Sequence, residues 1–167
     1  SGKIVTKTSK NGAVALLCAS LLNMGKTTLK NVPRIEEVYR LLEVLESIGV
    51  SIKWTGNNLE IKRPKRLSLK NINRQSAIRT RSIILMIGPL IHSLRKFNLP
   101  QAGGCKLGSR TVKPHFYALQ RMGVDIAAKT DSYAVTSKEL HSNHIVLYES
   151  GDTVTENVLM AAAKLNG

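Results

Sequence analysis

The hydrophobic positions along the chain predict two kinds of helix. Residues 12–24 and 77–94 are apolar on nearly every face of a helix, which is typical of helices in a protein interior. Residues 35–48 and 112–122 carry apolar side chains three and four positions apart, so each has one buried face and one polar face. We therefore expect two core helices and two amphipathic helices.

Short runs rich in β-branched residues predict strands between these helices. The predicted strands are residues 3–8, 27–29, 51–54, 58–62, 99–101, 124–128, 133–135 and 145–147. Asn11 is suited to the N-cap position of the first core helix, and Pro33 to the start of the amphipathic helix that follows it. Gly88-Pro89 should kink the second core helix.

The chain contains an internal repeat. In residues 45–52 and again in residues 119–126, an amphipathic helix ends at a glycine and a short strand follows. Gly49 and Gly123 are suited to the left-handed position after a helix. Repetition at a fixed offset indicates copies of one unit, which we interpret as strand, helix, strand, helix, strand, strand. The sequence thus predicts an α/β (α+β) protein of repeated βαβαββ units.

A third unit begins near the end of the sequence, because residues 158–163 echo residues 16–21. We divide the chain into a first unit (1–74), a second unit (75–142) and the start of a third (143–167). A repeat unit cannot cover its own apolar face. We therefore expect the chain to be one part of a longer domain.

Composition and charge narrow the class of protein. The 167 residues are 43% hydrophobic, which is enough to bury a core. The net charge of +14 implies an anionic partner, such as nucleic acid, an acidic membrane or a polyphosphate substrate. Aromatic residues make up only 4% of the chain, which argues against a base-stacking surface. The apolar run at residues 12–24 is shorter than the roughly 20 residues that span a bilayer.

The two cysteines form neither a disulfide framework nor a zinc motif, so we expect reduced thiols in the cytosol. Cys18 lies among leucines, and core packing explains it. Cys105 lies in a glycine-rich, cationic loop, where backbone N–H groups can approach an anion and a thiol becomes reactive. A surface turn with a free cysteine is the alternative. The loop comprises Gly103, Gly104, Cys105, Lys106, Gly108 and Arg110.

Other charged residues allow two interpretations each. Lys10 could reach an anion at a helix N-terminus, or it could simply be solvated. Arg81 lies on an otherwise apolar helix, so its guanidinium needs a buried partner or a ligand. The basic run at residues 62–79 is interpreted as a solvated linker. His115 is the histidine nearest the Cys105 loop in sequence.

Taken in order, these motifs resemble those of the bacterial UDP-N-acetylglucosamine 1-carboxyvinyltransferases, which are enolpyruvyl transferases. The Gly-Gly-Cys loop is the most specific of them, and the resemblance covers the whole chain. It implies one incomplete inside-out α/β barrel domain of a two-domain enzyme. The matching motifs are Ser9-Lys10-Asn11, Arg81, Gly88-Pro89-Leu90, Gly103-Gly104-Cys105 with Gly108, Arg110 and His115, and Thr155-Glu156-Asn157 with Met160-Ala161-Ala162.

The resemblance also implies an activity. Enolpyruvyl passes from phosphoenolpyruvate to the 3′-hydroxyl of UDP-N-acetylglucosamine, and phosphate is released, in the cytoplasmic synthesis of peptidoglycan precursors that cell shape and division require. The implied partners are these two substrates and the missing remainder of the enzyme or a second copy of the chain. It implies no cofactor and no metal, and we expect no membrane contact. Nucleic acid is not an expected partner.

Residue roles follow from the same resemblance. Cys105 is the expected general acid and the thiol that fosfomycin alkylates. Lys10, Asn11 and Arg110 are expected to bind phosphoenolpyruvate. The residues expected to bind UDP-N-acetylglucosamine are Asn11, Arg81, Arg110, Thr111, Val112, Lys113, Pro114 and His115.

Some positions depart from the family pattern. Lys113 stands in place of an acid, Leu85 in place of an aromatic residue, and Asp152-Thr153 in place of Val-Gly. The family's catalytic aspartate lies in a part of the enzyme that this sequence does not include. We therefore expect no transferase activity from this chain alone. The alternatives are a shikimate-pathway enolpyruvyl transferase, which typically has Lys-Ser at Lys10-Asn11, and a basic nucleic-acid-binding module.

Overall fold

A computed structural model describes residues 2, 4, 8–101 and 111–166 of the chain. The described residues combine helices with antiparallel strands, which confirms the predicted α/β class. In chain order the elements are α1 (Lys10–Ala19), the 3-10 helix η1 (Ser20–Leu22), β1 (Lys26–Leu29), α2 (Glu36–Ser47), β2 (Ser51–Thr55), β3 (Asn58–Lys62), α3 (Arg74–Ile78), the 3-10 helix η2 (Arg81–Met86), α4 (Ile87–Leu90), β4 (Lys96–Pro100), α5 (Lys113–Gln120), β5 (Val124–Ala128), β6 (Ser132–Ser137) and α6 (Asp152–Ala162).

The strands form two similar sheets, ordered β1-β3-β2 and β4-β6-β5. Every neighbouring pair is antiparallel. The strand order places β3 and β6, the last strand of each unit, in the middle of their sheets. Leu59 and Ile61 on β3, like Tyr133 and Val135 on β6, are buried. Both sheets therefore turn an apolar face inward.

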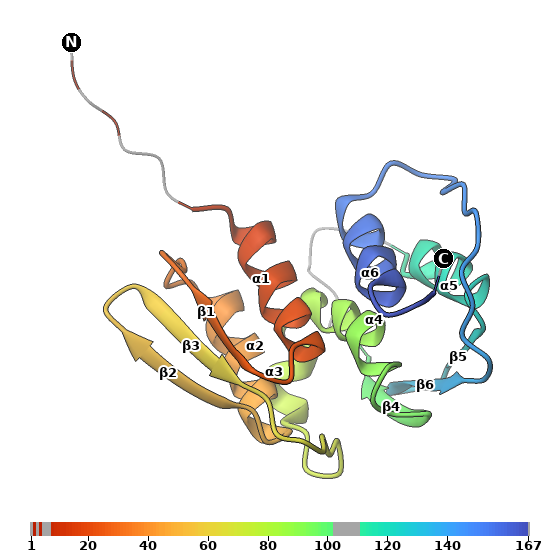
Figure 1. Ribbon diagram of the computed structural model, residues 1–167, viewed down its shortest axis with the longest axis horizontal. Coiled ribbons are helices and arrows are strands. Elements are labelled where there is room, and N and C mark those ends of the chain that lie inside the picture. Colours follow the sequence, from red (N-terminus) through yellow and green to blue (C-terminus); the bar gives the residue numbers. More distant parts are fainter. Residues whose placement is uncertain (1, 3, 5–7, 102–110, 167) are drawn as a thin grey trace.

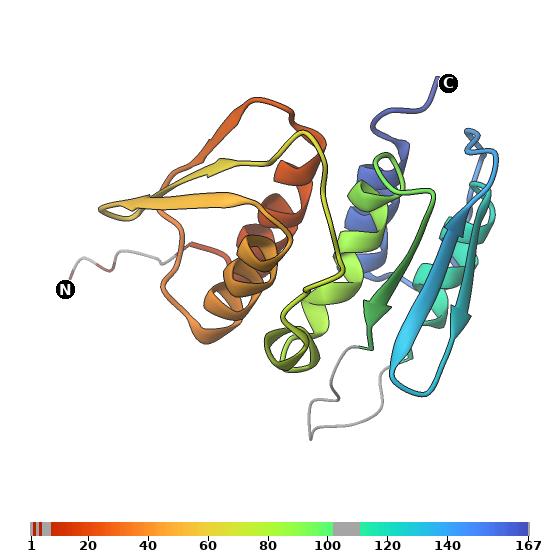
Figure 2. The same cartoon turned by 90° about the horizontal axis from the view of Figure 1, so that it is seen from below.

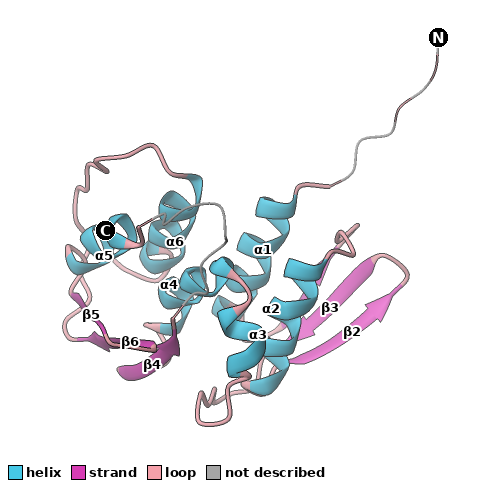
Figure 3. Ribbon diagram, turned by 180° about the vertical axis from the view of Figure 1, so that it is seen from behind, coloured by secondary structure: helices cyan, strands magenta, loops and turns pink. Residues whose placement is uncertain are grey.

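The helices lie between the two sheets, as Figures 1 and 2 show. Helices α1, η2, α4 and α6 contact one another in the middle, while α2 packs on the first sheet and α5 on the second (Figure 3). All residues of 82–90 are buried, which confirms that this predicted core helix lies in the interior. Helices inside and sheets outside are the inside-out arrangement expected.

The repeat is visible in the backbone. Gly49 (φ 98°) and Gly123 (φ 86°) both have left-handed conformations just after α2 and α5. Each leads directly into the next strand, as predicted from the matching sequence segments. The order helix, strand, helix, strand, strand thus occurs twice. The division of the chain at residues 74 and 142 stays a prediction.

Several predicted boundaries are wrong. The side chain of Ser9, not Asn11, caps α1, because its oxygen accepts a hydrogen bond from the Gly12 backbone N–H. Helix α2 begins at Glu36, three residues after Pro33. Residues 145–147 form no strand but belong to the segment that crosses from β6 to α6. Most of predicted strand 3–8 lies outside the described residues.

The predicted helix 77–94 is divided into α3, η2 and α4. The break falls at Thr80, whose extended backbone (φ −126°) and side-chain oxygen cap η2 by accepting from the Ser82 N–H. Threonine competes well for such a cap because its hydroxyl bonds nearby backbone groups. Pro89 is the third residue of α4 and lies in its first turn.

The basic run at residues 62–79 is not wholly a solvated linker. Arg63 is buried (6% exposed), and its guanidinium donates hydrogen bonds to the Leu21 carbonyl (2.6 Å) and the Ser93 hydroxyl (3.1 Å). Burial lowers the pKa of Arg63. This side chain therefore fastens the end of η1 to the segment after α4.

Candidate active site

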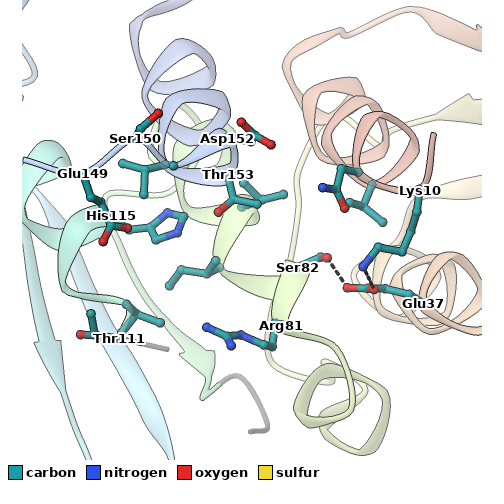
Figure 4. Close-up of a pocket in the computed structure, with 17 residues that line it drawn as sticks. Lys10, Glu37, Arg81, Ser82, Thr111, His115, Glu149, Ser150, Asp152 and Thr153 are labelled. Atoms are coloured by element: carbon teal, nitrogen blue, oxygen red, sulfur yellow. Dashed lines mark hydrogen bonds and ion pairs between the residues drawn. The ribbon is translucent and has the colours of Figure 1, made fainter. Parts of the chain in front are cut away.

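A cavity of about 720 Å³ opens where several helices begin. Its walls come from α1, α2, η2, the segment entering α5, and the start of α6 (Figure 4). The lining residues are Lys10, Asn11, Val14, Glu37, Arg81, Ser82, Ile84, Leu85, Thr111, Val112, His115, Glu149, Ser150, Gly151, Asp152, Thr153 and Val154.

Helix N-termini dominate the walls of this cavity. Lys10 is the first residue of α1, Arg81 of η2 and Asp152 of α6, and Val112 is the N-cap of α5. Unpaired backbone N–H groups give a helix start a partial positive charge, and Lys10 and Arg81 add full charges. The arrangement suits an anionic ligand such as a phosphate.

Lys10 is held at the cavity by Glu37 of α2. The Lys10 ammonium lies 2.9 Å from one Glu37 oxygen, and the hydroxyls of Thr80 (3.1 Å) and Ser82 donate to the other. Burial of Glu37 disfavours its charge, but the hydrogen bonds from Ser82, Lys10 and Thr80 and the charge of Lys10 outweigh this, so the pKa of Glu37 lies below its ordinary value. Glu37 therefore stays ionised and orients the lysine.

Arg81 and His115 project into the cavity from η2 and α5 (Figure 4). His115 is only 6% exposed. Burial, and secondarily the positive charge of Arg81, lowers the pKa of His115 to about 4. The imidazole is therefore neutral at physiological pH, while the guanidinium is charged. Glu149 and Asp152 lie on the wall formed by the start of α6.

The structure brings together most of the residues that sequence reasoning selected. Lys10, Asn11, Arg81, Thr111, Val112 and His115 all line the cavity, although they come from three separate parts of the chain. Lys113 and Pro114 lie in the first turn of α5 but are not among the lining residues. Cys105 and Arg110 lie outside the described residues. Cys18 is fully buried in the core, as predicted, and burial raises its pKa.

Sequence reasoning missed the acidic and hydroxyl groups of the cavity. Glu37 and Ser82 carry no motif of their own, since acids are common in the first turn of any helix. Asp152 and Thr153 depart from the family pattern, so no motif selects them as site residues. Glu149 belongs to a segment expected to contain a strand.

Comparison with known proteins identifies the class. The chain is similar in fold to the enolpyruvyl transferase NikO from Streptomyces tendae (TM-score 0.77, 16% identity, covering 100% of this chain and 39% of that one). It is also similar in fold to EPSP synthase from Acinetobacter baumannii (TM-score 0.69, 20% identity, covering 99% and 39%). The fold is therefore that of the enolpyruvyl transferases, as the sequence predicted.

The sequence matches place the chain within this class. A family model of EPSP synthase (3-phosphoshikimate 1-carboxyvinyltransferase) matches residues 1–167, and the chain belongs to this family. It is 33% identical over 167 residues to the UDP-N-acetylglucosamine 1-carboxyvinyltransferase of Bradyrhizobium diazoefficiens, and 31% identical over 166 residues to that of Borreliella burgdorferi. The predicted resemblance is thus confirmed. The chain covers 38% and 39% of the length of these two relatives.

Two further findings concern the described residues only. None of their helices has the length and apolar character needed to cross a bilayer. Nor do they contain a group of three or more histidine, cysteine, aspartate or glutamate side chains arranged to hold a metal ion.

Proposed function

We propose that this chain is part of an enzyme that transfers enolpyruvyl from phosphoenolpyruvate to the 3′-hydroxyl of UDP-N-acetylglucosamine. The observation that carries the proposal is one cavity lined by Lys10, Arg81 and His115, each of which lies in the first turn of its helix. Thr111 and Val112, which directly follow Arg110 of the cysteine loop, line the same cavity. Both substrates are phosphorylated anions, and the sequence relatives carry the name of this transferase.

In the proposed reaction, the substrate hydroxyl gives its proton to the catalytic aspartate in the remainder of the enzyme and its oxygen adds to C2 of phosphoenolpyruvate, while C3 gains a proton. Cys105 is the general acid that supplies this proton. Loss of phosphate from C2 and of a proton from C3 then restores the double bond. Lys10 and Arg110 hold the phosphate and carboxylate of phosphoenolpyruvate, with Asn11 beside them, and stabilise the charge that develops.

The sugar nucleotide occupies the side of the cavity next to α5. Arg81, His115 and residues 110–114 contact it there, and Asn11 contacts it from the wall formed by the start of α1. Thr111 and Val112 reach it from the cavity wall, and Lys113 and Pro114 follow them in the first turn of α5. This reaction belongs to cytoplasmic peptidoglycan precursor synthesis, and through it to cell-wall biogenesis and cell division.

The proposed partner of the chain is the remainder of the same enzyme. Two exposed leucines support it: Leu16 on α1 is 55% exposed and Leu159 on α6 is 64% exposed, although both helices belong to the central layer. Apolar side chains on core helices are normally covered. Chain beyond the described residues, or a second copy, would cover them.

The proposal predicts that the chain binds UDP-N-acetylglucosamine through Arg81. In calorimetric titrations, Arg81→Ala should weaken binding at least about tenfold, the loss of a charge-assisted phosphate contact. Arg79→Ala is the matched control, because Arg79 lies two residues away and its nearest carboxylate, that of Glu36, is 3.9 Å distant at the surface. Equal affinity of the two variants, or no binding by the parent chain, would contradict the proposal.

A further inference from the structure

Asn157 of α6 is a fully buried polar residue next to the cavity (0% exposed). Its side chain makes three hydrogen bonds to the neighbouring helices. The amide nitrogen donates to the Ile84 carbonyl (3.0 Å) and contacts His115 Nδ1 (3.1 Å), and the amide oxygen accepts from the Gly88 N–H (2.8 Å). Asn157 thus joins η2, α4 and α5 at one point.

These contacts determine which way the amide faces. The Gly88 N–H can only donate, so the atom beside it must be the amide oxygen; the Ile84 carbonyl can only accept, so the nitrogen must face it. The second hydrogen of the amide nitrogen then points at His115 Nδ1. That ring nitrogen must accept, and the proton of the neutral imidazole must therefore be on Nε2.

A close approach of two helices makes this contact possible. A Cβ placed on Gly88 would lie 2.5 Å from the Asn157 backbone oxygen and 2.6 Å from its side-chain oxygen. Only glycine lets α6 come so near α4 at this level. Gly88 of the Gly-Pro-Leu motif and Asn157 of the Thr-Glu-Asn motif, 69 positions apart, are therefore joined by a hydrogen bond.

The opposite edge of the imidazole lies at the cavity (Figure 4). Among the described residues, the charged groups that line this cavity are Arg81 from η2, Glu149 and Asp152 from the segment that enters α6, and the paired Lys10 and Glu37 on the far wall. A second proton on His115 would have to enter at Nδ1, against the Asn157 N–H and beside the Arg81 charge. Both effects oppose an imidazolium.

We propose that Asn157 is a positioning residue that presents His115 to the cavity as a neutral Nε2–H donor for an anionic oxygen of the ligand. The choice of ligand rests on the proposed function: the oxygen belongs to the diphosphate of the sugar nucleotide. The positive charge of Arg81 attracts this diphosphate, and the Nε2–H of His115 donates a directed hydrogen bond to it. The histidine contact is then insensitive to pH between about 6 and 8, where a free histidine would titrate.

The first test needs no variant. Long-range ¹H–¹⁵N correlation spectra of the ¹⁵N-labelled chain distinguish the two neutral tautomers of each histidine. We expect His115 to be the Nε2–H tautomer at neutral pH and to titrate well below pH 6.5, the ordinary value for a histidine. An Nδ1–H tautomer, or a titration of His115 near pH 6.5, overturns the proposal.

The second test reverses the hydrogen bond. Asn157→Asp replaces the donor with a carboxylate, which accepts from Nδ1–H and favours the imidazolium. The pKa of His115 should rise, and affinity for UDP-N-acetylglucosamine should then change at least about threefold between pH 6 and 8, as expected when a histidine titrates in this range. The parent should show a nearly flat profile.

Asn143→Asp is the matched control, because Asn143 is exposed and its amide donates to the Arg121 carbonyl at the surface. It should keep the parent tautomer and profile. Identical pH profiles for the parent and Asn157→Asp overturn the proposal. If neither the parent nor Asn143→Asp binds the nucleotide, the proposed function and its ligand assignment fail, whereas the tautomer of the free chain is decided separately by the spectra.

Discussion

At the scale of single residues, two groups of the cavity are held in one protonation state, Glu37 as the carboxylate and His115 as the neutral imidazole. Glu37 accepts hydrogen bonds from Lys10, Thr80 and Ser82, which favour the carboxylate. His115 is buried beside a cation and faces a donor at Nδ1, which disfavours the imidazolium. Both states suit an anionic ligand. The Glu37 carboxylate orients Lys10, and the neutral His115 offers a hydrogen-bond donor without adding a charge.

The depressed pKa of His115 should make stability depend on pH. Above pH 6.5 the ring is neutral in both the folded and the unfolded chain. Below 6.5 the unfolded chain gains a proton that the folded chain takes up only near pH 4, so the free energy of unfolding should fall across this interval by roughly 3 kcal/mol from this group. Urea unfolding at a series of pH values measures this fall in the free energy of unfolding.

The control for this measurement is His115→Asn, which removes the titrating group. The pH dependence of its unfolding free energy should be shallower than that of the parent, while His92, whose pKa burial also lowers, contributes equally to both chains. Parallel curves would contradict the neutral, buried state of His115.

Glu37 should contribute to stability as well as to the site. Glu37→Gln removes the negative charge to which Lys10, Thr80 and Ser82 donate hydrogen bonds. Because hydrogen bonds to charged groups are stronger than neutral ones, we expect the free energy of unfolding to fall by about 1–2 kcal/mol. Glu46→Gln, at an exposed position of the same helix, should change stability by less than about 0.5 kcal/mol. Equal effects in urea titrations would count against the Glu37 network.

At the scale of elements, the contact between α4 and α6 depends on Gly88. Gly88→Ala would force a methyl group against the Asn157 backbone, which must move. We expect a loss of at least about 2 kcal/mol of unfolding free energy, as for overpacked cores. The midpoint of urea unfolding measures this loss. The ¹H–¹⁵N spectra should also lose the signals of the Nε2–H tautomer of His115.

Gly12→Ala is the control, because a Cβ there would meet only Ser9 atoms at 3.6 and 3.7 Å, an ordinary contact. Alanine has the higher helix propensity, so this variant should be neutral or more stable by up to about 1 kcal/mol. If both variants lost the same amount of unfolding free energy, the close approach of α4 and α6 could not be the cause of the effect of Gly88→Ala.

The sequence predicted elements where local signals and burial agree. The glycines at 49 and 123 and strands β2 and β3 lie where the pattern placed them. The break at Thr80 was not predicted, because its hydroxyl and that of Ser82 bond to Glu37, 43 and 45 positions away. Predicted strand 145–147 failed because a short apolar run does not reveal whether a partner strand is at hand.

The site was predictable to a similar extent. Lys10, Arg81 and His115 stand in motifs, so a resemblance could select them. Glu37 and Asn157 act through contacts between distant helices, and no local pattern reveals which buried amide faces which ring. Lys113 and Pro114 follow Arg110 in sequence and lie in the first turn of α5, but they are not among the residues that line the cavity.

At the scale of the whole molecule, two sheets enclose a central helical layer (Figure 1). The cavity opens where helices of this layer begin. The chain covers 38% of the length of one relative named for the complete reaction. We expect the purified chain to release no phosphate from phosphoenolpyruvate and UDP-N-acetylglucosamine in a steady-state assay. Turnover would show that every catalytic group lies within these 167 residues.

The central claim is that this chain carries the reactive-thiol part of an enolpyruvyl transferase site. Mass spectrometry of the chain treated with fosfomycin in the presence of UDP-N-acetylglucosamine tests it most directly, with Cys18 as the internal control. Cys18 is fully buried and burial raises its pKa, so it should stay unmodified until the chain is unfolded. The account predicts a single adduct on Cys105. Equal labelling of Cys18 and Cys105, or no adduct on Cys105, would contradict it.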